Sequence, residues 1–175
     1  MEGIFNFNGR SIEGGVLSNF HTGVVDIDGK KYPSGEASFQ GSKYLAASDN
    51  SSCLKRKAEL MEYGEKFQVG GEFAALPPGQ KGKPLSVEDL KNWTLKGEAV
   101  QRKICRYKFE HEARVASCLK NHMTDVLVHP SRVSDIKIKD RIWEGRGKIV
   151  EGKVVVLGGN ILGKLWMEIR DEFLV

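Results

Sequence analysis

The chain has 175 residues, of which 40% are hydrophobic and 29% are charged, and its formal net charge is +4. This length favours one domain, residues 1–175, and the composition is that of a globular protein with enough apolar side chains to bury a core. No apolar run is long enough to span a bilayer, and the first residues lack the pattern of a signal peptide. The mild positive charge allows a phosphorylated ligand or a nucleic acid and requires neither.

The three cysteines, Cys53, Cys105 and Cys118, are isolated in the sequence and form no C-x-x-C pair. An odd number of isolated cysteines fits reduced thiols in an intracellular protein. We therefore expect a cytoplasmic protein with no membrane partner. The four histidines are scattered and show no zinc-binding spacing, so we expect neither a metal site nor a cofactor.

The first part of the chain predicts a β-hairpin followed by two helices. The hairpin consists of an apolar run at residues 24–27, the turn signal Asp28-Gly29 and a returning strand at residues 30–32. A helix is expected over about 35–47, because apolar and small residues recur there at helical spacing. A second helix is expected over about 53–63.

The second part of the chain begins with a loop, residues 70–84, that is rich in Gly and Pro. The elements expected after it are a long helix over about 96–109, more helix to about Leu127, an irregular segment over 128–152, a strand at Val154–Leu157 and a last helix opening at Gly158-Gly159-Asn160. The predicted fold class is α+β, a helix-dominated single domain with a small, mostly antiparallel sheet.

A polar stripe on the first predicted helix is the most informative pattern. At about 100° per residue, Glu36, Gln40 and Lys43 fall within roughly 60° of one another on one helix face. Apolar residues flank this stripe, while small residues such as Ser38 and Gly41 occupy the far side. One interpretation is that the stripe faces a cavity, where a partly desolvated carboxylate can act as an acid or base near neutral pH. The other is a solvated helix face with two apolar edges.

The segment from the last strand into the last helix resembles a phosphate-binding loop without completing one. The pattern G-x-x-x-x-G-K is present, but Leu165 stands where a Ser or Thr would hold Mg²⁺, and only ten residues follow. We reject a nucleotide hydrolase for this reason. Free backbone N–H groups at Gly159 and Asn160 are predicted to bind a phosphate or ribose oxygen. A plain helix cap is the alternative.

Two further patterns each have a functional and a structural interpretation. Arg102 and Arg106 lie one turn apart on a basic helix, where they could bind phosphate or form a solvated face. Asp140, Trp143 and Glu144 lie in a Gly-rich loop. That composition is typical either of a platform that stacks against a ring beside a charged group, or of an ordinary surface loop.

These segments together resemble the NADAR (YbiA-like) family, in the same order and over most of the chain. The matching elements are Leu17-Ser18-Asn19-Phe20, Asp28 to Glu36 followed by Phe39-Gln40 and Lys43, Asn92-Trp93, Lys108-Phe109, Asp140-x-x-Trp143, and Gly159-Asn160-x-Leu162-Gly163 with Met167-Glu168-x-Arg170. The elements around Glu36 and Asn160 are specific in combination.

The resemblance implies N-glycosidase activity on ribosylated nitrogen compounds. It implies that Glu36 is the key acid or base, that Trp143 stacks in the pocket and that Asp140 or Glu144 assists. The substrate-binding residues implied or expected are Asn19, Phe20, Gln40, Lys43, Trp93, Arg102, Gly159, Asn160 and Gly163. The expected substrate is an ADP-ribosylated or phosphoribosylated small molecule or nucleic acid, foremost ADP-ribose attached to guanine.

Three positions depart from the family pattern, and rival functions follow from them. Ala37 stands where a His is usual, Gly71 where an Arg is usual, and His129 where an acid is expected. Arg102 or Arg146 could replace the missing phosphate-binding Arg. The alternatives are hydrolysis of ribosylaminopyrimidine phosphates of riboflavin biosynthesis, binding of ADP-ribose or NAD without cleavage, and an accessory protein acting on another NAD-derived signal.

Overall fold

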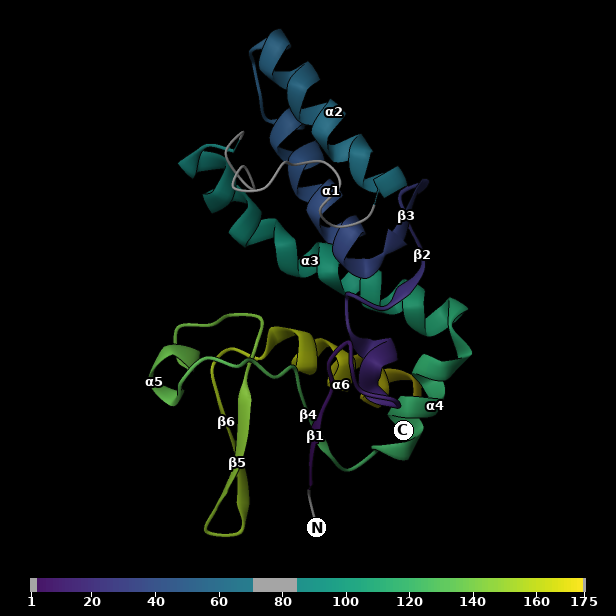
Figure 1. Ribbon diagram of the computed structural model, residues 1–175, viewed down its shortest axis with the longest axis vertical. Helices are drawn as coiled ribbons and strands as arrows, with labels where there is room; N and C mark the ends of the chain where they lie inside the picture. Colours follow the sequence, from purple (N-terminus) through teal and green to yellow (C-terminus); the bar gives the residue numbers. More distant parts are fainter. Residues whose placement is uncertain (1–2, 71–84, 175) are drawn as a thin grey trace. The chain divides into compact units, whose positions relative to one another are not determined.

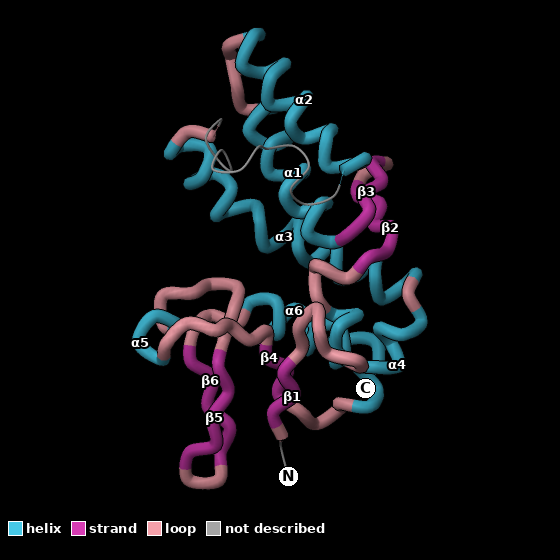
Figure 2. Tube along the Cα trace, viewed as in Figure 1, coloured by secondary structure: helices cyan, strands magenta, loops and turns pink. Residues whose placement is uncertain are grey.

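The computed structural model describes residues 3–70 and 85–174, and these fall into two compact units (Figure 1). Residues up to His21 and from Lys108 onward form what we call the terminal unit, and Thr22–Tyr107 form the middle unit. Helices predominate in both units, and the strands pair two by two (Figure 2). The helix-dominated α+β class with small, mostly antiparallel sheets is confirmed, and the one-domain organisation stays a prediction. Of the helices that the structure describes, not one combines the length and the apolar character that a membrane crossing needs.

The middle unit begins with the expected hairpin. β2 (Thr22–Ile27) pairs antiparallel with β3 (Lys30–Ser34), and Asp28-Gly29 forms the turn. Both turn residues have positive φ, 53° and 82°, which is the backbone twist that a tight two-residue hairpin turn requires. Ser34, the last residue of β3, caps the next helix by accepting a hydrogen bond from the Ala37 N–H at 3.1 Å. The chain therefore passes from hairpin to helix without a loop.

Small residues allow two helices of the middle unit to approach closely. α1 (Gly35–Asp49) packs along α2 (Leu54–Gly70), which continues beyond the predicted end near residue 63. A Cβ placed on Gly41 would lie 3.1 Å from the carbonyl oxygen of Gly64 and 2.5 Å from the ring of Tyr32. The face of α1 that carries small residues is thus a packing face, with Ser38 fully buried.

α3 (Val87–His111) begins nine residues before its predicted start at residue 96, because a capping box starts it. The Asp89 carboxylate accepts a hydrogen bond from the Ser86 N–H at 2.7 Å, and the Ser86 hydroxyl accepts one from the Asp89 N–H at 3.1 Å. Arg56 of α2 pairs with the same carboxylate. Burial by itself raises the pKa of Asp89, but the bonds from Ser86 and Arg56 outweigh it and hold that pKa below its usual value.

Asp89→Asn is expected to lower the free energy of unfolding at pH 7 by about 1–2 kcal/mol, because charge-assisted bonds to the cap and to Arg56 are lost. The folded-state pKa is depressed, so this stabilisation is complete above the unfolded pKa of about 3.9 and is lost as the pH falls below it. Urea unfolding at pH 7 and pH 3 should show a smaller gap between variant and wild type at pH 3 than at pH 7. Glu88→Gln, at the exposed neighbouring position, is the control. A gap of equal size at both pH values would contradict the prediction.

The terminal unit is built around a parallel pair of short strands. β1 (Ile4–Asn6) pairs with β4 (Val126–Val128), so the prediction of helix as far as Leu127 is wrong, and α4 ends earlier (Ala113–Asn121). α6 (Ile161–Leu174) buries Trp166 completely, and the indole donates a hydrogen bond to the Leu17 carbonyl at 3.0 Å. That carbonyl ends a short 3-10 helix, η1 (Gly14–Leu17). The last helix thus holds the N-terminal segment in place.

The segment predicted to be irregular, residues 128–152, contains regular structure. α5 (Asp135–Ile138) is a single turn, and β5 (Arg146–Val150) pairs antiparallel with β6 (Lys153–Leu157), the strand expected at Val154–Leu157. Strand β5 is polar at its start and exposed at its end, so it lacks the apolar alternation by which a strand is recognised. The loop predicted over 70–84 lies outside the described residues, apart from Gly70 at the end of α2.

Candidate functional site

The first two turns of α1 hold the candidate acid in a defined geometry. The Gln40 side-chain amide donates a hydrogen bond to Glu36 Oε1 at 2.8 Å. Glu36 is half-buried and Gln40 is only 8% exposed. Because Gln40 is buried, this part of the stripe is withdrawn from water and is not a fully solvated helix face. A half-buried carboxylate with one oxygen bound to a neutral donor keeps its second oxygen for a proton or a water molecule.

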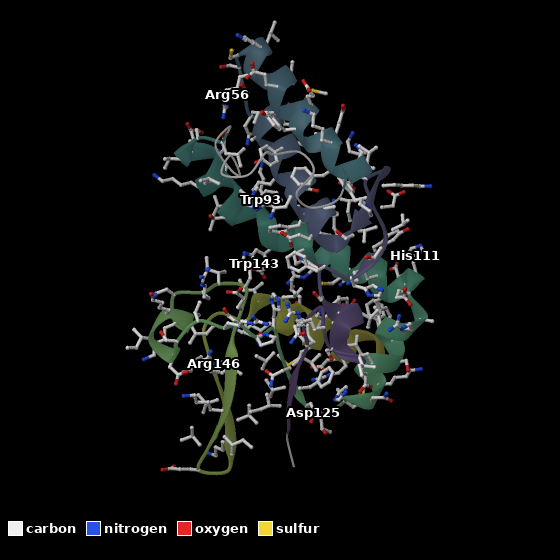
Figure 3. All side chains as sticks on the ribbon, in the orientation of Figure 1. Arg56, Trp93, His111, Asp125, Trp143 and Arg146 are labelled. Atoms are coloured by element: carbon white, nitrogen blue, oxygen red, sulfur yellow. The ribbon has the colours of Figure 1, made fainter. Side chains whose placement is uncertain are left out.

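The flank of the polar stripe is aromatic. Phe39 meets Trp93 of α3 edge to face, with the ring centroids 5.0 Å apart, and Trp93 is labelled in Figure 3. Gly97 of α3 allows this contact, because a Cβ there would lie 3.3 Å from the Trp93 indole. Phe39 also packs on a buried cluster of the hairpin and α3, which consists of Val25, Ile27 and Ile104. Trp93, predicted to bind substrate, therefore has a packing role next to the stripe.

Two basic residues of the middle unit that are expected to bind substrate have neighbours of their own. Lys43 is half-buried, and its Nζ lies 5.7 Å from the centroid of the Tyr44 ring. Arg102 forms an ion pair with Glu98, one turn earlier on α3, at 3.5 Å. An exposed ion pair of this kind contributes little to stability. Binding of a substrate by either residue stays a prediction.

Asn160 acts as a structural clamp in the terminal unit. Its side chain is buried, its amide donates to the Leu127 carbonyl at 2.9 Å, and its carbonyl oxygen accepts from the His129 N–H at 3.0 Å. Its backbone has a φ of 48°, in the left-handed region that Asn tolerates better than most residues. Asn160 thus ties the start of α6 to the end of β4.

The expectation that the N–H groups before α6 are free is wrong. Gly159 donates to the Arg141 carbonyl at 2.8 Å, Asn160 to Glu144 at 3.0 Å and Ile161 to Ile142 at 3.1 Å. These bonds anchor the tryptophan loop, residues 140–145, and do not leave a phosphate cradle. Gly163 is needed for close approach, since a Cβ there would lie 2.2 Å from the Leu127 carbonyl oxygen. Contact of these residues with a substrate stays a prediction.

The tryptophan loop carries its acids at different depths. Asp140 is exposed, whereas Glu144 is half-buried and lies 3.6 Å from Arg141 Nε. Trp143 between them is half-buried (Figure 3). At the end of the loop, the Gly145 N–H donates to the His129 carbonyl at 2.8 Å. Backbone bonds therefore hold both sides of this loop, which presents Trp143 from a fixed support.

Two cationic side chains of the terminal unit are buried, and the sequence analysis does not predict them as functional residues. Lys108 is 5% exposed; its Nζ donates to the Ser18 carbonyl at 2.8 Å and lies 5.7 Å from the centroid of the Trp166 ring. Arg170 is 7% exposed and donates to the carbonyls of His122 and Asp125 at 2.8 and 2.7 Å. Both residues belong to motifs that resemble the family pattern. A Lys or Arg at a position where the helical spacing predicts a buried residue is the signal that the sequence offers. Lys108 fixes the segment that carries Asn19 and Phe20.

Comparison with known proteins identifies relatives over nearly the whole chain. The proteins named N-glycosidase YbiA from Escherichia coli (strain K12) and Shigella boydii serotype 4 (strain Sb227) are each 30% identical over 174 residues, which cover 98% of this chain and 89% of the relative. The chain belongs to the YbiA-like (NADAR) family. The NMR structure of the E. coli protein YbiA matches with a TM-score of 0.63 and 28% identity, covering 98% of this chain and 86% of that one. No protein-family model matches the chain.

The departures from the YbiA-like pattern have structural counterparts. Ala37 is fully buried in the apolar core with Tyr32 and Tyr44, so no polar group replaces the usual His at this position. The His129 ring stacks on Phe7, with centroids 5.6 Å apart. Gly71 lies outside the described residues. Two of the three departures therefore belong to packing in this member of the family.

Proposed function

We propose that this chain is an N-glycosidase that hydrolyses the bond between C1′ of a ribose and a nitrogen of a base. Membership of a family whose named relatives are N-glycosidases, over 98% of the chain, is the observation that carries this proposal. Glu36 supplies the acid–base chemistry, because its carboxylate is half-buried and held by Gln40.

Cleavage of the C1′–N bond leaves its electron pair on nitrogen and builds positive charge on the ribose, as in glycoside hydrolysis. A water oxygen bonds to C1′, and one proton of that water ends on the departing nitrogen. Glu36 Oε2 accepts the proton from the water while Oε1 remains bound to Gln40. The negative carboxylate also stabilises the oxocarbenium-like transition state.

The remaining assignments come from the family resemblance. In this proposal Trp143 stacks on a ring of the substrate, and Asp140 or Glu144 assists proton transfer. Glu144, which is half-buried beside Arg141, is better suited to this role than the exposed Asp140. Asn19 orients a ribose hydroxyl.

The substrate we propose is ADP-ribose attached to guanine, in a nucleotide or a nucleic acid. A base inside a duplex is inaccessible to such chemistry, so single-stranded or unstacked guanine should react faster. The second candidate is a module that binds ADP-ribose without cleaving it, which the burial of Ala37 in place of a polar residue favours.

A substrate screen decides between these functions. The purified chain is incubated separately with ADP-ribosylated guanosine, ribosylaminopyrimidine phosphate and NAD, and the released base is measured by chromatography. We expect release of guanosine or guanine from the first compound only. Release from the pyrimidine substrate alone would transfer the assignment to that reaction. A thermal shift with ADP-ribose and no release from any compound would identify a binding module.

A further inference from the structure

A pocket of about 490 Å³ in the terminal unit lies where two parallel strands end. It is lined by residues 8–10, which follow β1, by residues 130–132, which follow β4, and by Phe20. Because β1 and β4 are parallel, their C-terminal ends meet at one edge, and the loops beyond them converge. Ligands in proteins with parallel strands commonly bind at this edge.

The charge of this pocket is positive and unbalanced. Arg10 and Arg132 both line it and are exposed. Among the described residues neither guanidinium forms a salt bridge, and the lining holds no Asp or Glu. Two guanidinium groups converging on one hollow without a counter-charge favour an anion, and guanidinium binds phosphate oxygens in a bidentate manner.

The wall that carries Arg10 and Phe20 is held by local hydrogen bonds and, through Ser18, by the buried Lys108. The Asn8 side chain accepts a hydrogen bond from the Arg10 N–H at 2.9 Å, which makes a tight turn. A Cβ on Gly9 would lie 3.6 Å from the Phe20 Cβ, so the two segments are in contact. Phe20 follows Ser18, whose hydroxyl accepts from the Phe20 N–H at 3.2 Å and whose carbonyl accepts from the buried Lys108.

Arg146 fixes the opposite wall. Its guanidinium donates to the carbonyls of Ser131 and Val133 at 3.0 and 2.5 Å, and it also pairs with Asp135. Asp135 is paired with Lys148 as well, so the nearest acid of this loop is already neutralised. Arg146 is therefore a positioning residue for the loop of Arg132, and its direct replacement of a phosphate-binding Arg stays a prediction.

We propose that this pocket binds the phosphate groups of a small nucleotide-type ligand. Arg10 and Arg132 contact the phosphate oxygens, and the ring of Phe20, which is 50% exposed, packs against the sugar or base. An exposed aromatic ring beside paired cations suits a ligand with both a flat ring and a diphosphate. That this ligand is the diphosphate part of the substrate rests on the proposed function, whereas the anion site itself does not.

Calorimetric titration with ADP, inorganic pyrophosphate and adenosine tests the pocket. We expect the wild-type chain to bind ADP and pyrophosphate, and adenosine much more weakly. Arg10→Gln together with Arg132→Gln should weaken ADP binding by about a hundredfold, at about tenfold for each charge-assisted contact. Arg114→Gln with Lys120→Gln removes the same charge from exposed positions of α4 and should change binding less than about threefold. Phe20→Ala should weaken ADP binding and leave pyrophosphate binding unchanged.

Each outcome decides the proposal. It is overturned if the wild-type chain binds no ADP, if the two double variants lose equal affinity, or if a single-stranded oligonucleotide binds the pocket more tightly than ADP. Circular dichroism and thermal unfolding confirm that each variant is folded before its titration is interpreted. ADP binding and turnover are also measured for Glu36→Gln, which separates the anion site from the proposed N-glycosidase function. Loss of turnover with intact ADP binding supports both proposals. Intact turnover removes only the role of Glu36.

Discussion

Glu36→Gln is expected to reduce the turnover rate of the ribosylated substrate by a factor of about 10²–10⁴, the usual contribution of a general acid or base. The amide has the shape of the carboxylate but cannot accept the proton of the attacking water or offset positive charge on the ribose. Its oxygen can still accept the hydrogen bond from Gln40, so the fold and the substrate KM should change little. Single-turnover release of the base, followed by chromatography, measures the effect.

Glu59→Gln is the matched control for this experiment, because Glu59 lies exposed on α2 of the same unit. It removes one carboxylate charge from the middle unit without touching Gln40. Turnover of this control should stay within about twofold of wild type, as expected for a surface substitution. Near-normal turnover of Glu36→Gln would remove the carboxylate from the mechanism and leave the family relationship intact.

The elements that could be predicted are those specified by local chemistry. Asp28-Gly29 specifies its turn because both positions need a positive φ, and the helix that begins at Gly35 is specified by its cap and its spacing. The strand at 126–128 could not be found in this way. Three apolar residues fit a helix or a strand, and the choice depends on pairing with residues 4–6, far away in the chain.

In the candidate site too, the features that depend on local sequence could be predicted, and those that depend on contacts between distant residues could not. Glu36 and Gln40 lie four residues apart on one helix, so their hydrogen bond follows from helical spacing. The prediction of free N–H groups in the turn before α6 is wrong, because these groups donate to carbonyls within residues 141–144. No side-chain pattern in the sequence encodes that backbone contact. Arg10 and Arg132 were overlooked for a related reason: only the parallel pairing of β1 with β4 brings their loops to one pocket.

Asn160→Ala is expected to lower the free energy of unfolding by about 3–7 kcal/mol. The substitution leaves the Leu127 carbonyl and the His129 N–H without their partner, at about 1–3 kcal/mol each when buried. Alanine at a φ of 48° adds about 1 kcal/mol of backbone strain. Urea unfolding followed by circular dichroism measures the change, which is a large part of the total stability of a typical domain.

Asn160→Gly separates the two contributions, because glycine adopts the left-handed backbone without strain but lacks the amide. It should be more stable than Asn160→Ala by about 1 kcal/mol and still far less stable than wild type. Asn50→Ala, at an exposed position after α1, should change stability by less than about 0.5 kcal/mol. Wild-type stability in Asn160→Ala, combined with weaker binding of ADP or ADP-ribose, would show that the Asn160 amide serves the ligand and not the fold. Both Asn160 variants lose the two side-chain hydrogen bonds that join α6 to β4. If both variants were as stable as wild type, Asn160 would not act as a structural clamp.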